Sequence, residues 1–266
     1  MKKIIALLLV FVMVLALAAC GSAKPAEEPA VEEAVQDAEE AVEETVEEAV
    51  EEAAEVKVMS YEEFAAAELD TPVVVETYVQ ATQSWWNDQI TVYTQAPDGA
   101  YFLYNLPCSE EDAAKLVPGQ KIRVSGVKAE WSGEIEIIDA TFEFLDADPW
   151  IAEPTDITEV WGTDEMINYQ NQLVSIKGAT VEAYDESGAA FAYKDPDGKT
   201  DDLYFKVTLG DTTYDFCVEF YLCGNDTDVY KAVEGLQVGD TVDLEGFLYW
   251  YNGPNLHTTG IGVKAN

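Results

Sequence analysis

The residues best suited to binding chemistry in this 266-residue chain are aromatic side chains in two regions. Indole and phenol rings can stack on sugar rings or on other flat ligands. Trp85, Trp86 and Trp131 have serine, asparagine or glycine neighbours, which favours exposure. The alternative is that several rings fill hydrophobic cores, where aromatic residues dominate. The candidate ligand-binding residues are Trp85, Trp86, Tyr93, Tyr101, Tyr104, Trp131, Trp250 and Tyr251.

A run of carboxylates around a glycine turn, at residues 195–202, is a candidate cation site. Calcium prefers several hard oxygen ligands. A calcium site here would use Asp195, Asp197, Asp201 and Asp202. The segment lacks the twelve-residue EF-hand pattern with its closing glutamate, and a plain hairpin turn accounts for the same residues. We expect no cofactor, with calcium as the exception that the sequence leaves open.

The sequence gives little support for catalysis. Its single histidine, His257, lies in a predicted strand and shares a face with Thr259, Ile261 and Val263, which favours a structural role. No nucleophile elbow, phosphate-binding loop or cysteine–histidine cluster with zinc spacing occurs. We therefore expect a protein that is not an enzyme.

Three cysteines, Cys108, Cys217 and Cys223, follow the N-terminal region. An odd number cannot all pair within one chain. Cys217 and Cys223 are close enough in sequence to form a disulfide across a turn, and an extracytoplasmic location would permit it. The alternative is a pair of buried free thiols, packed as small hydrophobic residues.

The N-terminus carries a targeting pattern. Lys2 and Lys3 precede a short apolar run, which ends in small residues directly before Cys20. This arrangement resembles the lipobox of diacylglyceryl-modified bacterial lipoproteins. The resemblance implies that residues 1–19 are a signal peptide and that Cys20 is the lipidated first residue of the mature protein. The alternative is an ordinary secretory signal with an incidental cysteine.

The charge is strongly negative, with 52 acidic against 14 basic residues. Residues 26–55 contain 14 acidic residues and no basic one. Their thin Ala/Val stripe and repelling glutamates predict a marginal helix that interchanges with extended coil, so residues 20–56 are expected to form an acidic stalk. Because nucleic-acid binding depends on Lys and Arg, the composition also predicts that nucleic acid is not a partner.

The rest of the chain contains an internal repeat. Three glycines, Gly119, Gly126 and Gly133, recur 120 residues later as Gly239, Gly246 and Gly253, within similar sequences. Repeats of this kind define the structural unit. We therefore expect two domains, at residues 57–147 and 155–266, with the boundary near two prolines, Pro149 and Pro154.

Each copy predicts three strands, a short helix and two further strands. In the first copy the strands lie near 73–79, 90–94, 100–104, 122–127 and 134–144, and Ser109 begins the helix. In the second copy they lie near 173–181, 189–193, 203–209, 242–247 and 256–263, with an extra hairpin through 214–219 and a helix to Glu234. This order is that of an OB-fold, a five-stranded Greek-key barrel. The fold class is mainly β, as two tandem OB-like barrels.

The pattern over residues 60–266 resembles secreted bacterial lipoproteins and periplasmic proteins that carry OB-fold modules. We expect a lipid-anchored, non-catalytic binding protein of the bacterial cell envelope, outside the cytoplasm, with a glycan, small molecule or envelope protein as partner. The alternative is a structural or assembly lipoprotein that binds envelope proteins without a small ligand. One fold hosts many functions, so the sequence does not identify the ligand.

Overall fold

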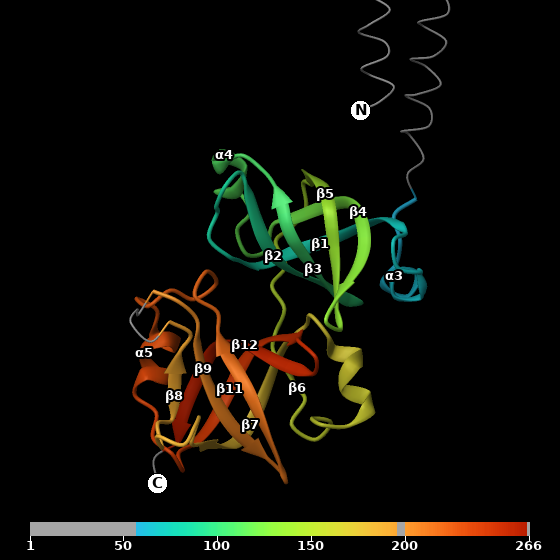
Figure 1. Ribbon diagram of the computed structural model, residues 1–266. Coiled ribbons are helices and arrows are strands. Elements are labelled where there is room, and N and C mark those ends of the chain that lie inside the picture. The colour runs from blue at the N-terminus through green and yellow to red at the C-terminus, as the bar shows by residue number, and fades with distance from the viewer. Residues whose placement is uncertain (1–56, 196–199, 265–266) are drawn as a thin grey trace, which may run out of the picture. The chain divides into compact units, whose positions relative to one another are not determined.

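The computed structural model describes residues 57–195 and 200–264, and Figure 1 shows that these residues contain two β-barrels. Residues from Lys57 onward form one compact unit. The predicted signal peptide, the lipidation site at Cys20 and the acidic stalk lie outside the described residues. Within the described ranges, no helix is both long enough and apolar enough to span a membrane.

The first barrel follows the predicted element order. Helix α3 (Tyr61–Ala66) begins with a capping box in which Ser60 and Glu63 bond each other's backbone amides. The strands that follow are β1 (Pro72–Thr82), β2 (Gln89–Ala96), β3 (Gly99–Pro107), β4 (Lys121–Trp131) and β5 (Glu134–Phe144). They close in the order β1-β2-β3-β5-β4. Helix α4 (Glu110–Ala113), capped by Ser109, lies between β3 and β4 as predicted.

The second barrel repeats this plan with additions at its edges. Its strands are β7 (Leu173–Glu182), β9 (Leu203–Leu209), β10 (Thr212–Val218), β11 (Thr241–Trp250) and β12 (Pro254–Lys264). Pairing between β7 and β9 closes the barrel. Helix α5 (Asp228–Glu234), capped by Thr227, lies between β10 and β11. The additions are β6 (Thr155–Asp156), β8 (Phe191–Tyr193) and the 3₁₀ helix η1 (Asp164–Tyr169).

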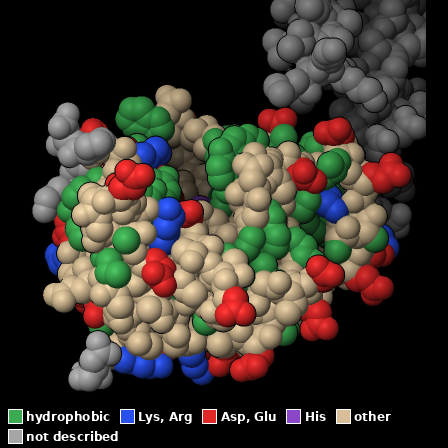
Figure 2. Space-filling view, turned by 60° about the horizontal axis from the view of Figure 1, so that its bottom comes forward, with side chains coloured by type: hydrophobic (Ala, Val, Ile, Leu, Met, Phe, Trp, Pro, Cys, Tyr) green, Lys and Arg blue, Asp and Glu red, His purple; other side chains and the backbone are tan. Residues whose placement is uncertain are grey.

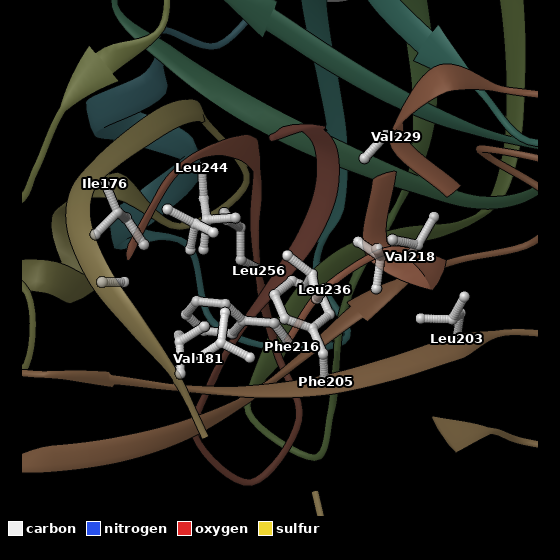
Figure 3. Close-up of a cluster of buried hydrophobic side chains, with 14 of the residues drawn as sticks. Ile176, Val181, Leu203, Phe205, Phe216, Val218, Val229, Leu236, Leu244 and Leu256 are labelled. Atoms are coloured by element: carbon white, nitrogen blue, oxygen red, sulfur yellow. The ribbon is translucent and has the colours of Figure 1, made fainter. Parts of the chain in front are cut away.

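Each barrel has its own hydrophobic core. The first core includes Val75, Leu103 and Ile137, all of which are fully buried. The second core is larger because helix α5 and η1 add side chains to it, and Figure 3 shows residues from several strands meeting there. Labelled members are Ile176, Val181, Leu203, Phe205, Phe216, Val218, Val229, Leu236, Leu244 and Leu256. The prediction of two tandem OB-like barrels is confirmed.

The strand assignment within the second barrel needs a correction. The segment 203–209 is the second barrel strand, β9, and the predicted extra hairpin supplies the third strand, β10. The segment predicted as strand two is the short edge strand β8, which pairs only with β9 among the described strands. The described ends of the Asp-rich segment, Asp195 and residues 200–202, therefore lie between the first and second barrel strands. Sequence reasoning failed here because a long loop that contains an edge strand resembles an additional barrel strand.

The repeated glycines have matching structural roles. Gly119 and Gly239 have φ values of 91° and 92°, a region that favours glycine. Gly126 and Gly246 lie at register shifts where β4 pairs with β5 and β11 with β12. A Cβ on Gly126 would lie 2.6 Å from Ile137 Cγ2, and one on Gly246 would lie 2.3 Å from the His257 carbonyl oxygen. The bulges therefore require glycine in both copies.

Candidate functional site

The outer face of β2 and β3, where OB-folds commonly bind ligands, is covered by the second barrel. Residues 90–96 of β2 are buried without a break, whereas a strand with one solvent-facing side alternates. Tyr93 and Phe102 form a cluster with Phe247, and the rings of Tyr93 and Phe247 stack with centroids 4.6 Å apart. Gln95 also accepts a hydrogen bond from the Leu173 amide at 2.9 Å. This face is therefore an interface between the barrels.

Four of the predicted ligand-binding rings have structural roles. Tyr93 is 1% exposed, and its hydroxyl shares a 2.6 Å hydrogen bond with Nδ1 of His257. Tyr101 lies in the first core against Phe64. Trp85 packs against that core and donates its indole N–H to the Cys108 carbonyl oxygen at 3.0 Å. Trp250 packs against the second core.

Trp86 and Tyr104 are exposed and line a pocket of about 200 Å³, together with Tyr221 of the second barrel. Trp86 is 72% exposed, Tyr104 46% and Tyr221 54%. The remaining lining residues are amides, hydroxyls and one apolar side chain: Gln83, Ser84, Gln89, Ile90, Thr91 and Asn105. Among the described residues, no charged side chain lines it. Figure 2 shows one face of the molecule, where hydrophobic side chains gather beside a hollow and acidic side chains are scattered around them.

A tight turn presents Trp86. The backbone groups of Trp86 and Gln89 bond each other in both directions, at 3.0 and 3.2 Å. Asn87 and Asp88 between them have φ values of 52° and 59°, as in a type I′ turn, which suits Asn and Asp. Asn105, at φ 48°, donates its backbone N–H to Thr91 Oγ1 at 3.3 Å. Hydrogen bonds within the turn and from the Asn105 amide therefore fix the backbone of the first barrel that lines the pocket.

Tyr221 is a site residue that sequence reasoning missed. It lies between Glu219 and Cys223 in a turn after β10, and its carbonyl oxygen accepts the Ser84 amide at 2.7 Å. The sequence gives no signal for this contact, because it joins residues 137 positions apart in different barrels. The pocket is thus a composite of the first barrel's loop and the second barrel's turn.

Trp131 and Tyr251 form a second exposed aromatic pair outside this pocket. Their rings stack with centroids 5.4 Å apart at an interplanar angle of 22°, and each is about half exposed. They come from the corresponding β4–β5 and β11–β12 turns, which a hydrogen bond from the Asn252 amide to the Ser132 carbonyl oxygen joins at 2.7 Å. The four exposed rings of the predicted set therefore divide between the pocket and this separate aromatic pair.

The predicted calcium ligands do not meet as a cation site in the described part of the chain, where no three acidic, Cys or His side chains form such a group. Asp202 accepts hydrogen bonds from Lys194 at 3.1 Å, Tyr204 at 3.2 Å and the Phe220 amide at 3.0 Å. Asp201 lies 3.7 Å from Lys194, and Asp197 falls outside the described residues. Calcium binding by Asp195 and its neighbours stays a prediction.

The structure does not contain the predicted disulfide, because Cys217 and Cys223 are both free and buried. Phe216 and Val218, on either side of Cys217 in β10, belong to the second core. Alternation along a strand directs Cys217 to the opposite face. Cys223 packs within that core. The two thiols therefore lie on opposite sides of the β10 wall.

Several ionisable groups are buried around the interface between the barrels. Glu134 is fully buried, and its Oε2 accepts the Trp250 amide at 2.8 Å and Gln170 Nε2 at 3.2 Å. Burial raises the pKa of Glu134 to about 8. Burial also lowers the pKa of His257 to about 4, so this histidine is neutral at physiological pH. These groups support the interface and are not part of the pocket lining.

No known family model matches this chain, and no curated protein sequence matches it. Among solved structures, the chain is similar to a murine DNA binding protein bound with double-stranded DNA, at 12% identity and a TM-score of 0.36, covering 73% of this chain and 96% of that one. It is also similar to the Ifi202 HINa domain in complex with double-stranded DNA, at 11% identity and a TM-score of 0.33, covering 74% and 98%. A deletion mutant of the single-stranded DNA binding protein from Thermus aquaticus matches at 12% identity and a TM-score of 0.26, covering 73% and 94%.

The descriptions of these three structures name DNA-binding proteins and no enzyme. The confirmed OB-like fold corrects our expectation that nucleic acid is not a partner, and we withdraw that exclusion, which rested on net charge alone. Net charge is a property of the whole surface, whereas binding depends on local side chains. Barrels of this class bind oligonucleotides as well as oligosaccharides.

Proposed function

We propose that this protein is a lipid-anchored, non-catalytic binding protein of the bacterial cell envelope, and that its ligand is a neutral glycan. The anchor rests on Cys20 and the signal pattern before it. The binding site is the pocket between Trp86, Tyr104 and Tyr221. Binding alone requires no catalytic residue.

The observation that carries the proposal is the chemistry of the pocket lining. From Lys57 onward the chain has 38 acidic and 11 basic residues, yet within the part of the chain that the structure describes no charged side chain lines the pocket. A ligand must therefore be held by stacking and by neutral hydrogen bonds. Three exposed rings can stack on the apolar faces of sugar rings, while amides and hydroxyls bond sugar hydroxyls. An uncharged polyhydroxylated ligand fits this combination.

The experiment is a calorimetric titration of the full chain in detergent with neutral oligosaccharides, with a single-stranded oligonucleotide titrated in parallel. We expect saturable binding to a neutral oligosaccharide that Trp86→Ala weakens about tenfold, equivalent to about 1.4 kcal/mol. The matched control is Trp131→Ala, which removes another exposed indole that lies outside the pocket. It should leave the affinity unchanged.

Two results would contradict the proposal. If no neutral oligosaccharide binds, the structural or assembly role without a small ligand is favoured. If Trp86→Ala and Trp131→Ala weaken binding equally, the ligand is not held by this pocket. Preferential binding of the oligonucleotide, lost in Trp86→Ala, would retain the pocket and replace the ligand class.

A further inference from the structure

The turn that brings Tyr221 to the pocket is held by the ionisable side chain of Glu219. The Leu222 amide donates to Glu219 Oε2 at 2.7 Å, and the Cys223 amide donates to the Glu219 carbonyl oxygen at 2.8 Å. The Tyr221 amide also donates to the Glu219 carboxylate. The carboxylate therefore binds the backbone of Tyr221 and of the residue after it.

The other side of Tyr221 is fixed by the first barrel. Its carbonyl oxygen accepts both the Ser84 amide at 2.7 Å and the Ser84 hydroxyl at 3.3 Å. Ser84 itself lines the pocket, two residues before Trp86. The contacts thus run from Glu219 through Tyr221 to the loop that presents Trp86.

We propose that Glu219 is a positioning residue for the pocket: its ionised carboxylate fixes the turn that presents Tyr221, so that the pocket binds its glycan more tightly when Glu219 is charged. The inference rests on the proposed function and adds a residue that does not line the pocket. Hydrogen bonds to an ionised acceptor are roughly twice as strong as those to a neutral one. Protonation of Glu219 therefore loosens the turn.

The groups around Glu219 place this change near neutral pH. Burial, followed by the charge of Asp202, raises the pKa of Glu219 to about 7, while the backbone bonds and Lys194 act in the opposite direction. Other groups that interact electrostatically with it are Tyr93 on β2 and Cys217 and Cys223 of the second barrel. All three have raised pKa values and are neutral at pH 7. Of Glu219 and these three groups, Glu219 alone titrates close to pH 7.

Backbone amide NMR on the full chain tests the positioning directly and needs no ligand. The Tyr221 and Leu222 amide signals should titrate with a midpoint near pH 7, and the Ser84 amide should follow them. In Glu219→Gln, whose amide oxygen still accepts hydrogen bonds but does not ionise, all three signals should stop titrating in this range. Amides that do not titrate, or a Ser84 amide that ignores the change, would overturn the proposal.

The affinity for the neutral oligosaccharide as a function of pH then measures the consequence of Glu219 ionisation for binding. Affinity of the wild type for the neutral oligosaccharide should rise about fivefold from pH 5.5 to 8.5, consistent with a modest change in hydrogen-bond strength. Glu219→Gln should show the lower affinity at every pH. Tyr221→Ala should bind weakly at every pH, and adding Glu219→Gln to it should change nothing further. Additive effects of the two substitutions would show that Glu219 does not act through Tyr221.

A control separates Glu219 from the other buried acid. Glu134→Gln should keep the pH dependence of binding, because Glu134 contacts Trp250 and Gln170 and does not contact the turn. Loss of the dependence in Glu134→Gln would contradict the assignment to Glu219. Complete absence of oligosaccharide binding at every pH would overturn the proposed function, whereas pH-independent binding would overturn only the role of Glu219.

Discussion

The two barrels share a strand plan and a set of glycines but use the same face differently. In the first barrel, β2 is buried on both sides because the second barrel covers it. In the second barrel, the equivalent strand β9 alternates: Phe205 is buried, whereas Tyr204 and Lys206 are partly exposed. Duplication has thus turned one OB-like face into an internal interface. The pocket consequently formed at the edge of that interface, from a loop of one barrel and a turn of the other.

Alanine substitution at the two glycine bulges should cause the largest loss in the free energy of unfolding. It tests whether both bulges are equally essential. Gly246→Ala would place a Cβ 2.3 Å from a backbone oxygen, and Gly126→Ala would place one 2.8 Å from the Ile138 carbonyl oxygen. Backbone cannot move aside easily, so each should cost roughly 3 kcal/mol or more. Urea denaturation measures the loss. Gly260→Ala, whose Cβ would make ordinary 3.5 Å contacts, should be nearly neutral.

A result in which Gly126→Ala and Gly260→Ala have the same small effect would break the proposed equivalence of the two copies.

Substitution at the interface between the barrels should cause the next largest loss in the free energy of unfolding. Phe247→Ala removes a buried ring that stacks on Tyr93, and should cost roughly 3–4 kcal/mol in the free energy of unfolding. Because the interface couples the barrels, the single unfolding transition should also separate into two. Calorimetry would detect the separation. A single transition with unchanged midpoint would contradict an interface that stabilises the pair.

The buried acid Glu134 predicts an unusual pH dependence of stability. Its pKa of about 8 in the folded state exceeds the ordinary value of 4.5, so the folded protein holds the proton more tightly than the unfolded chain. Stability from this group is full below about pH 4.5 and is lost as pH rises toward 8. Urea unfolding at pH 5 and pH 9 should therefore differ by roughly 2–4 kcal/mol.

Glu134→Gln should flatten this dependence and exceed the wild type in stability at pH 9. Glu219 also has a raised pKa and contributes in the same direction, so a remaining slope in the variant is expected. If the free energy of unfolding of the variant falls with pH as steeply as that of the wild type, Glu134 is not the source of the pH dependence.

The smallest expected change in stability is that of Trp86→Ala, which we compare with substitution of its neighbour Trp85. Trp85→Ala removes a ring that packs on the first core and bonds the Cys108 carbonyl oxygen, so it should cost roughly 2–3 kcal/mol. Trp86→Ala removes a ring that is 72% exposed, and should stay within about 0.5 kcal/mol of the wild type. Thermal unfolding of the two variants measures the contrast. Equal losses would mean that Trp86 is part of a packed core.

Sequence reasoning predicted the first barrel closely because its signals are local. Strand alternation and the Ser109 cap both depend on residues near one another in the chain. It misassigned β8 and β9, because only pairing with β7 reveals which strand closes the second barrel. It also placed Tyr93 among the ligand-binding rings, because the sequence of β2 does not show that a second barrel buries its outer face.

The sequence likewise predicted the residues that the first barrel contributes to the candidate site, but not the residue that the second barrel contributes. Trp86 and Tyr104 stand on the loop and strand where an OB-like barrel presents ligand-binding residues. Tyr221 depends on a contact between barrels, which no periodicity encodes. The absence of charge from the pocket is likewise a property of the folded lining and cannot be inferred from an acidic composition.

Iodide quenching of tryptophan fluorescence tests most directly whether this pocket holds the ligand. It is measured with and without saturating neutral oligosaccharide, in the wild type and in Trp86→Ala. If the pocket binds the oligosaccharide, the quenchable emission lost in Trp86→Ala should be the part that the oligosaccharide protects, while Trp131 stays quenchable. Unchanged quenching of Trp86 in the presence of bound oligosaccharide, or protection of Trp131 instead, would contradict it.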